Sequence, residues 1–178
     1  HKKIIHVEAG LRTGNKNSPF PEEINRRMIS QLADIHLCPT QQAVQNLNKE
    51  QITNNVYLVG NTIVDMYEYI SRITKPSNVI QCILKKSSYY LVTLHRRENR
   101  GQHMTIMWDQ LITLKQTPFV YITHPSLPET YTLFNTCSHI QLLSPQNYEN
   151  MVHLIRHCKG IITDSGGLQE EAVCAGKK

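Results

Sequence analysis

The stretch GIITDSGGLQEEAVCAG, residues 160–176, decides the fold class because it joins a strand pattern to a helix pattern through glycine. Its first residues are apolar and β-branched, as in a buried strand. Its last residues follow a helical pattern that Gly176 terminates. A strand, a glycine turn and a helix in this order form the repeating unit of an α/β protein with a parallel sheet.

The same alternation extends over the chain. Short apolar runs predict seven strands, namely KKIIHV, IHLCP, NVYLVG, YYLVTL, FVYIT, HIQLL and GIITD. Helical patterns lie between most of them, at residues 22–33, 41–50, 63–73, 104–116, 148–157 and 168–175. Thr40 is a credible cap for the second helix, and the first is expected to place Ile24, Met28 and Leu32 on one apolar stripe. We therefore expect parallel sheets wound by crossover helices.

A change in composition at residues 74–88 suggests two domains. The segment TKPSNVIQCILKKSS is less periodic than its surroundings and separates two series of strands and helices. We place the boundary near residue 70, which gives domains at 1–69 and 70–178. The chain begins with His1 and ends with no closing strand, so we expect a piece of a longer protein.

Composition restricts the class of protein. A chain of 178 residues with 40% apolar residues can bury a core, and it has no apolar run of about 20 residues. We expect a soluble, unexported, cytoplasmic protein with no membrane partner. The five cysteines are odd in number and contain no CxxC pair, which favours reduced thiols over disulfides or a zinc site.

The net charge of +5 admits an anionic partner. Because the basic residues are scattered apart from HRRENR, residues 95–100, a small phosphorylated ligand fits better than a nucleic acid. A solvated basic surface without function remains the alternative.

Ionisable residues and glycines follow the predicted strands. Glu8, His95, His124 and the segment 164–167 each come where a strand ends. In open parallel sheets, ligands bind outside the carboxyl ends of the strands. The position of Glu8, at the end of a strand expected to be buried, therefore indicates a cleft.

The Ser165-Gly166-Gly167 turn is the most specific local signal. Unhindered backbone N–H groups and the positive end of the following helix can bind a phosphate. Glu171 lies about one turn into that helix, within reach of sugar hydroxyls on the same ligand. An ordinary glycine turn before a helix with a solvated acidic face remains open.

His95 precedes two arginines in the segment HRREN. Neighbouring positive charge favours its neutral form, whereas a bound diphosphate would favour the protonated form. For both His95 and His124, a structural hydrogen-bonding role is the alternative.

Glu8 and Glu22 are separated by a loop that would allow both carboxylates to face one cleft, where they can act as base and acid. Alternatively, Glu22 and Glu23 are ordinary acids of a first helical turn, favoured by the helix dipole.

Six ordered motifs carry a family resemblance: HVEAGLRT, PFPEEINRR, GNTIVD, HRREN, SPQNY and TDSGGLQEE. Over residues 6–176 the chain resembles the non-hydrolysing UDP-N-acetylglucosamine 2-epimerases of bacteria. The resemblance implies two Rossmann-like domains with parallel sheets in the glycosyltransferase-B arrangement, both incomplete here. It also implies a homodimer and no cofactor or metal.

The resemblance assigns roles to residues that match the family's motifs. The acidic pair corresponds to Glu8 and Glu22, and the active-site histidine to His95. His124 resembles a residue of the site at which a second UDP-GlcNAc molecule acts as an allosteric activator. The UDP contacts correspond to Gln146, Met151, Ser165, Gly166, Gly167 and Glu171.

The implied reaction interconverts UDP-GlcNAc and UDP-ManNAc, through elimination of UDP to 2-acetamidoglucal and re-addition, for polysaccharide precursor synthesis. Two alternatives remain. One is a glycosyltransferase of the same fold that uses a UDP-sugar donor. The other is a nucleotide-sugar-binding fragment without activity, which is what we expect of these 178 residues alone.

Overall fold

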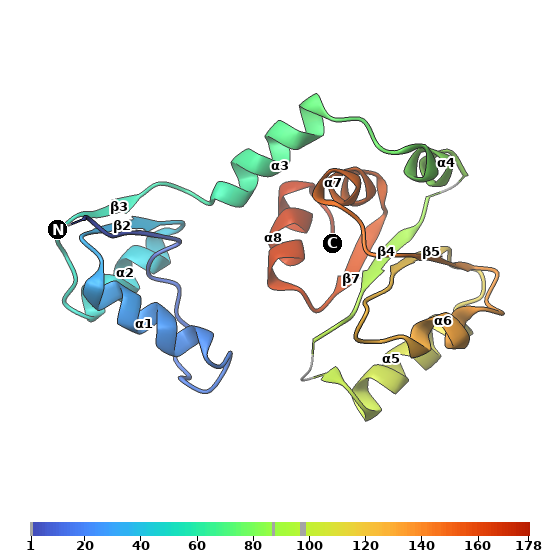
Figure 1. Ribbon diagram of the computed structural model, residues 1–178, viewed down its shortest axis with the longest axis horizontal. Helices are drawn as coiled ribbons and strands as arrows, with labels where there is room; N and C mark the ends of the chain where they lie inside the picture. Colours follow the sequence, from blue (N-terminus) through green and yellow to red (C-terminus); the bar gives the residue numbers. More distant parts are fainter. Residues whose placement is uncertain (1, 87, 97–98) are drawn as a thin grey trace. The chain divides into compact units, whose positions relative to one another are not determined.

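The computed structural model describes residues 2–86, 88–96 and 99–178, and the chain divides into two compact units, His1–Thr62 and Ile63–Lys178 (Figure 1). Each unit is an α/β structure with its own parallel sheet, so the predicted fold class is confirmed. The predicted domain boundary at residues 69 and 70 falls inside a helix, Thr62–Ile73, and stays a prediction.

The first unit contains a three-stranded parallel sheet in the order β1-β2-β3. Helix α2 packs beside it, and Ala9, Cys38, Ala43 and Leu47 form a small buried core. Thr40 caps α2, because its side chain accepts a hydrogen bond of 3.1 Å from the Ala43 N–H. The elements are β1 (Ile5–Val7), α1 (Glu22–Leu32), β2 (Ile35–Cys38), α2 (Gln41–Lys49) and β3 (Val56–Leu58).

One burial prediction for this unit was wrong. The strand β1 is not buried, since Ile5 and Val7 are 55% and 50% exposed at the edge of the sheet. In α1, Met28 and Leu32 of the predicted apolar stripe are well exposed. The reason is that α1 buries polar side chains, Glu23 and Ser30, against the loop at residues 9–22 instead of apolar ones against a sheet.

The second unit contains a four-stranded parallel sheet in the order β6-β5-β4-β7. Together with the first sheet it accounts for all seven predicted strands. Its strands are β4 (Tyr90–Thr93), β5 (Phe119–Ile122), β6 (Ile140–Leu143) and β7 (Gly160–Thr163). Its helices are α3 (Thr62–Ile73), α4 (Asn78–Lys86), α5 (Gln102–Thr113), α6 (Glu129–Phe134), α7 (Tyr148–His157) and α8 (Gly166–Cys174).

Helices cover both faces of this second sheet, as is usual for parallel sheets. One face carries Leu91 and Val120, which pack with residues of α3, α4, α7 and α8. The other carries Val92 and Tyr121, which pack with α5 and α6. Within the described residues, none of the helices has both the length and the apolar character that crossing a bilayer requires.

Candidate functional site

A pocket of about 160 Å³ lies at the carboxyl ends of the strands of the second sheet. It brings together four predicted site residues: His95 after β4, His124 after β5, Gln146 after β6 and Met151 on α7. These residues are up to 56 positions apart, and the strand order alone makes them neighbours. The lining consists of Thr93, His95, Ile122, Thr123, His124, Pro145, Gln146, Met151 and Leu168.

The two histidines of this pocket stack on each other, with ring centroids 5.1 Å apart and planes inclined by 17°. The Nδ1 atom of His124 accepts a hydrogen bond of 3.2 Å from the Ser126 backbone N–H and lies 2.7 Å from the Ser126 hydroxyl. In the neutral ring the proton is therefore on Nε2. This leaves His124 with an N–H group to donate elsewhere.

Asp164, at the end of β7, holds the loop that carries His95. Its carboxylate accepts hydrogen bonds from the backbone N–H of His95 at 3.0 Å, from that of Arg96 at 2.8 Å and from the Asn99 side chain at 3.1 Å. The Nδ1 atom of His95 lies 3.4 Å from Oδ1 of Asp164. The sequence placed Asp164 at a strand end without giving it a role, because its partners depend on the adjacency of β7 and β4.

The charge of Asp164 follows from these contacts. Burial by itself raises the pKa of this carboxyl group, but the hydrogen bonds from Arg96, Asn99 and His95 outweigh burial and lower the pKa below its usual value. Asp164 is thus ionised near neutral pH, and its negative charge faces His95.

The predicted phosphate turn is a strand-to-helix turn in the structure. Ser165 precedes α8, and its backbone N–H donates to the Thr163 hydroxyl at 3.0 Å. That hydroxyl shares a hydrogen bond of 2.7 Å with Thr93 on β4. A Cβ atom on Gly167 would meet nothing within 4 Å. The start of α8 is therefore open to a ligand, as a phosphate turn requires, although phosphate binding stays a prediction.

Glu171 lies one turn into α8 and is buried, with 9% of its surface exposed. Burial raises the pKa of its carboxyl group, a hydrogen bond from the Tyr148 hydroxyl lowers it, and the charge of Glu170 raises it, so that the pKa is raised overall. Burial and the negative charge of Glu171 raise the pKa of Tyr148 to about 12. Tyr148 thus fixes the Glu171 side chain, whose predicted ribose contact is untested.

Gln146 has a fixed side chain in the same pocket. Its Nε2 group donates to the Ser144 carbonyl at 2.8 Å, and its Oε1 atom accepts from Asn150 on α7 at 3.0 Å. An amide carries two donor hydrogens and two acceptor lone pairs, so capacity remains for a ligand.

Glu8 and Glu22 belong to the unit His1–Thr62, and both are exposed. Glu8 directly follows β1 and has a left-handed backbone with φ of 60°, which is uncommon for a residue with a side chain. Glu22 is the first residue of α1. Their place relative to the pocket of the other unit stays a prediction. Of the HRREN segment, the structure describes His95, Arg96 and Asn99, whereas Arg97 and Glu98 lie outside the described residues.

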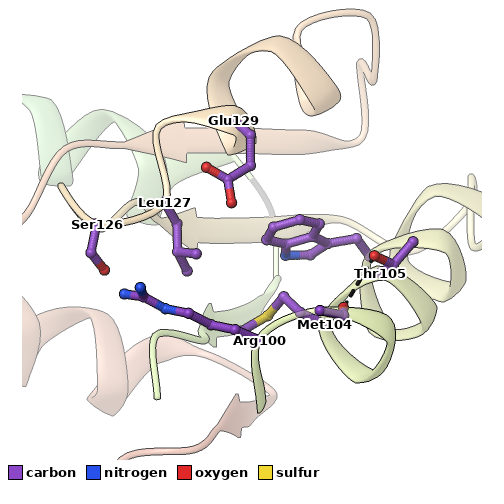
Figure 2. A pocket seen from close by; sticks show the side chains of 8 residues that line it. Arg100, Met104, Thr105, Ser126, Leu127 and Glu129 are labelled. Atoms are coloured by element: carbon purple, nitrogen blue, oxygen red, sulfur yellow. Dashed lines mark hydrogen bonds between the residues drawn. The ribbon is translucent and has the colours of Figure 1, made fainter. Parts of the chain in front are cut away.

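A second pocket, of about 210 Å³, lies between the starts of α5 and α6. Glu129 and Arg100 approach it from opposite sides, and Met104 and Leu127 also line it (Figure 2). No predicted site residue lines this pocket, whereas four line the first one. The first pocket is therefore the candidate site.

The fold and this pocket define an α/β protein that gathers polar residues at the carboxyl ends of parallel strands. Residues 1–178 match the family model described as UDP-N-acetylglucosamine 2-epimerase. The chain belongs to this family of isomerases.

Individual relatives agree with the match. The chain is 37% identical to the UDP-N-acetylglucosamine 2-epimerase of Campylobacter jejuni, over 98% of this chain and 51% of the relative. The Neisseria meningitidis UDP-GlcNAc 2-epimerase bound to UDP-GlcNAc superposes with a TM-score of 0.87 at 33% identity, covering 98% of this chain and 51% of that one. The S. aureus MnaA–UDP co-structure gives 0.87 at 34% identity, covering 98% and 50%. The chain thus spans about half the length of the relatives it matches.

Proposed function

We propose that the protein carrying this chain interconverts UDP-GlcNAc and UDP-ManNAc. The observation that carries the proposal is the pocket in which His95 and His124 stack beside the open start of α8, in a chain of the epimerase family. Relatives solved with UDP-GlcNAc or UDP support this ligand class.

The proposed reaction is an elimination followed by a re-addition. A base removes the proton from C2 of the sugar while UDP leaves from C1, which gives 2-acetamidoglucal and UDP. UDP then adds back to C1, and a proton is delivered to the other face of C2. Because the sugar is neither oxidised nor reduced overall, no nicotinamide enters the proposal.

The residues divide by the charge that each step requires. Glu8 and Glu22 supply proton transfer, with the roles of acid and base unassigned between them. His95 and the Ser165–Gly167 turn stabilise the negative charge that develops on the diphosphate. In this proposal Gln146 contacts UDP, Met151 lines the uracil pocket, and Glu171 contacts the ribose.

The arrangement of the whole protein is also proposed rather than observed. The glycosyltransferase-B arrangement is the one that the family resemblance implies, and His124 would contact a second, activating UDP-GlcNAc molecule. We propose a cytoplasmic homodimer that serves polysaccharide precursor synthesis; the five free cysteines support a reducing compartment.

Solvent exchange tests this function. A full-length version incubated with UDP-GlcNAc in deuterated water should incorporate deuterium at C2 and form UDP-ManNAc. Unlabelled sugar without manno product would contradict the proposal. Release of UDP only in the presence of an acceptor would instead indicate a glycosyltransferase.

A further inference from the structure

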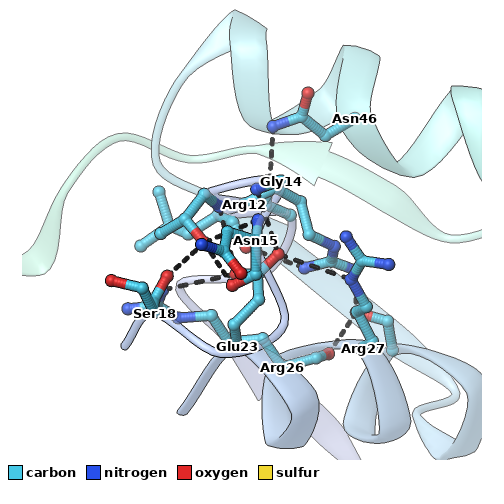
Figure 3. A network of polar contacts seen from close by, with 12 residues as sticks. Arg12, Gly14, Asn15, Ser18, Glu23, Arg26, Arg27 and Asn46 are labelled. Carbon is cyan, nitrogen blue, oxygen red and sulfur yellow. Dashed lines mark hydrogen bonds and ion pairs between the residues drawn. The ribbon is translucent and has the colours of Figure 1, made fainter. Parts of the chain in front are cut away.

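Glu23 is fully buried, although it is the second residue of an α-helix that begins at the surface. Its carboxylate accepts the backbone N–H of Thr13 at 3.0 Å and that of Gly14 at 3.3 Å. Arg27 and Arg26 approach the same carboxylate at 3.4 and 3.7 Å (Figure 3). An acid in a first turn normally points to solvent, so this orientation requires another explanation.

The charge on Glu23 is compensated within the unit. Burial alone raises the pKa of this carboxyl group, but the N–H groups of Thr13 and Gly14, together with Arg27, outweigh burial and lower the pKa overall. A buried carboxylate is tolerated when donors satisfy its oxygens, and it becomes costly when they are removed. Glu23 is therefore an anion that binds two consecutive amides of the preceding loop.

Other contacts fix the remaining parts of the loop at residues 9–22. Arg12 forms a bidentate pair with Glu50, with both distances 2.8 Å, and the Asn46 side chain donates to the Gly10 carbonyl at 3.0 Å (Figure 3). At Gly10, where φ is +81°, a Cβ atom would come within 2.2 Å of the Ala43 carbonyl oxygen on α2. The beginning of the loop is thus packed against α2, and its middle is held by Glu23.

The two ends of this loop carry the acids of the proposed reaction. Glu8 comes immediately before the loop and has a left-handed backbone. The N–H of the next residue, Ala9, donates a hydrogen bond of 2.9 Å to the Leu37 carbonyl on β2. Glu22 ends the loop and is adjacent to Glu23. We propose that Glu23 is a positioning residue, whose carboxylate fixes the loop so that Glu8 and Glu22 keep one relative geometry. The inference rests on the proposed function, in which proton transfer depends on alignment.

The test compares Glu23→Gln with wild type in the full-length version. Amide hydrogen exchange of residues 9–22 reports whether the loop is held, and the rate of C2 deuterium incorporation reports alignment. We expect faster exchange in the loop and a C2 rate lowered by about 100-fold, the scale that a misplacement of about 1 Å produces. The Kd for UDP should stay unchanged, because no proposed UDP contact lies in this unit. Glu23→Asp, which keeps the charge, should restore part of the rate.

Controls separate positioning from a general loss of structure. Glu68→Gln removes an exposed acid that pairs with Arg72 on α3, and it should change none of these quantities. If Glu23→Gln does not fold, Arg27→Ala removes one half-exposed partner and should shift loop exchange and C2 rate in the same direction.

Unchanged amide exchange in residues 9–22, or a wild-type C2 rate with a loosened loop, would overturn the inference. A wild-type protein without any C2 exchange would contradict the proposed function, and amide exchange would still decide whether Glu23 holds the loop.

Discussion

Two segments that follow parallel strands, residues 9–22 after β1 and residues 94–96 after β4, are each held by a carboxylate. Glu23 accepts two consecutive backbone N–H groups in the first loop, and Asp164 accepts two in the second. The two acids differ in their sequence separation from the amides that donate to them. Glu23 is 9 and 10 residues from its amide partners, whereas Asp164 is 68 and 69 residues away.

This difference shows that a functional loop can be fixed locally or through the sheet. The middle of the loop at 9–22 is held by the helix that directly follows it, because Thr13 and Gly14 donate to Glu23 of α1. The segment at 94–96 depends on β7 pairing beside β4, two strands that are 66 residues or more apart in sequence. We therefore expect loss of Asp164 to be the more damaging change.

The largest effect on stability is predicted for Asp164→Ala. It leaves the N–H groups of His95 and Arg96 without their acceptor and removes the partner of the His95 ring. We expect a loss of about 3 kcal/mol in unfolding free energy and about 100-fold in the C2 exchange rate. Chemical denaturation and deuterium incorporation measure the two.

Asp109→Asn is the matched control, because Asp109 is exposed on α5 in the same unit. It should leave stability and rate unchanged. If Asp164→Ala were as mild as this control, Asp164 would not hold the histidine loop.

Acidification should remove the stabilisation that the charged carboxylates of Glu23 and Asp164 give to the fold. Each has a pKa lowered in the folded state, so its stabilisation is complete above the unfolded value, 4.5 for Glu23 and 3.8 for Asp164, and is lost as pH falls through the folded value. Thermal unfolding between pH 7 and 3 should show a falling Tm below about pH 4.5, the unfolded glutamate value.

In Glu23→Gln the fall in Tm should be shallower, because Asp164 and Glu50, whose pKa values are also lowered in the folded state, still contribute. An identical pH profile for the variant and the wild type would show that the Glu23 charge does not stabilise the fold.

A smaller effect is expected for Thr163→Val, which keeps the shape of the side chain. The change removes the acceptor of the Ser165 N–H and the hydrogen bond with Thr93. We predict a cost of about 1 to 2 kcal/mol and a UDP affinity weakened by about fivefold, measured by calorimetry. Thr113→Val, at an exposed hydroxyl on α5, is the control. Equal UDP affinity in both variants would argue against a role of the turn in phosphate binding.

The smallest effect is expected for Thr40→Ala. Loss of the cap on α2 should lower the unfolding free energy by about 1 kcal/mol. UDP affinity should not change, because no proposed UDP contact lies in the unit that contains Thr40. A changed UDP affinity would contradict this expectation.

A further prediction concerns the 178-residue chain by itself. It is expected to bind UDP weakly and not to epimerise, because it spans about half the length of its relatives. Measurable turnover by this chain in the same deuterium assay would overturn that expectation.

The sequence predicts the strands well because each is a compact run of apolar residues. It misses α4 and α6 for different reasons. In α4 the β-branched residues Val79, Ile80 and Ile83 disfavour a helix on their own, and packing stabilises it, since Ile80 and Ile83 are buried in a cluster with residues of α7. Helix α6 is only six residues long, too short for a periodic pattern.

Motifs predicted His95 and Gln146 as site residues, and the structure places both in one pocket, whereas their roles stay predictions. The sequence assigned no role to Asp164 or Glu23, because the hydrogen bonds that their carboxylates accept from backbone N–H groups are visible only in the structure. For Asp164 this depends on the neighbouring strand. For Glu23 it depends on an inward rotation of the side chain that the helix dipole argument does not predict.

The central claim is the proposed epimerisation, in which Glu8 takes part in proton transfer at C2 of a UDP-sugar. Glu8→Gln in the full-length version tests it most directly, through C2 deuterium exchange and UDP affinity measured on one preparation. The account predicts that exchange at C2 disappears while the Kd for UDP stays at its wild-type value. Exchange that persists at the wild-type rate would contradict it.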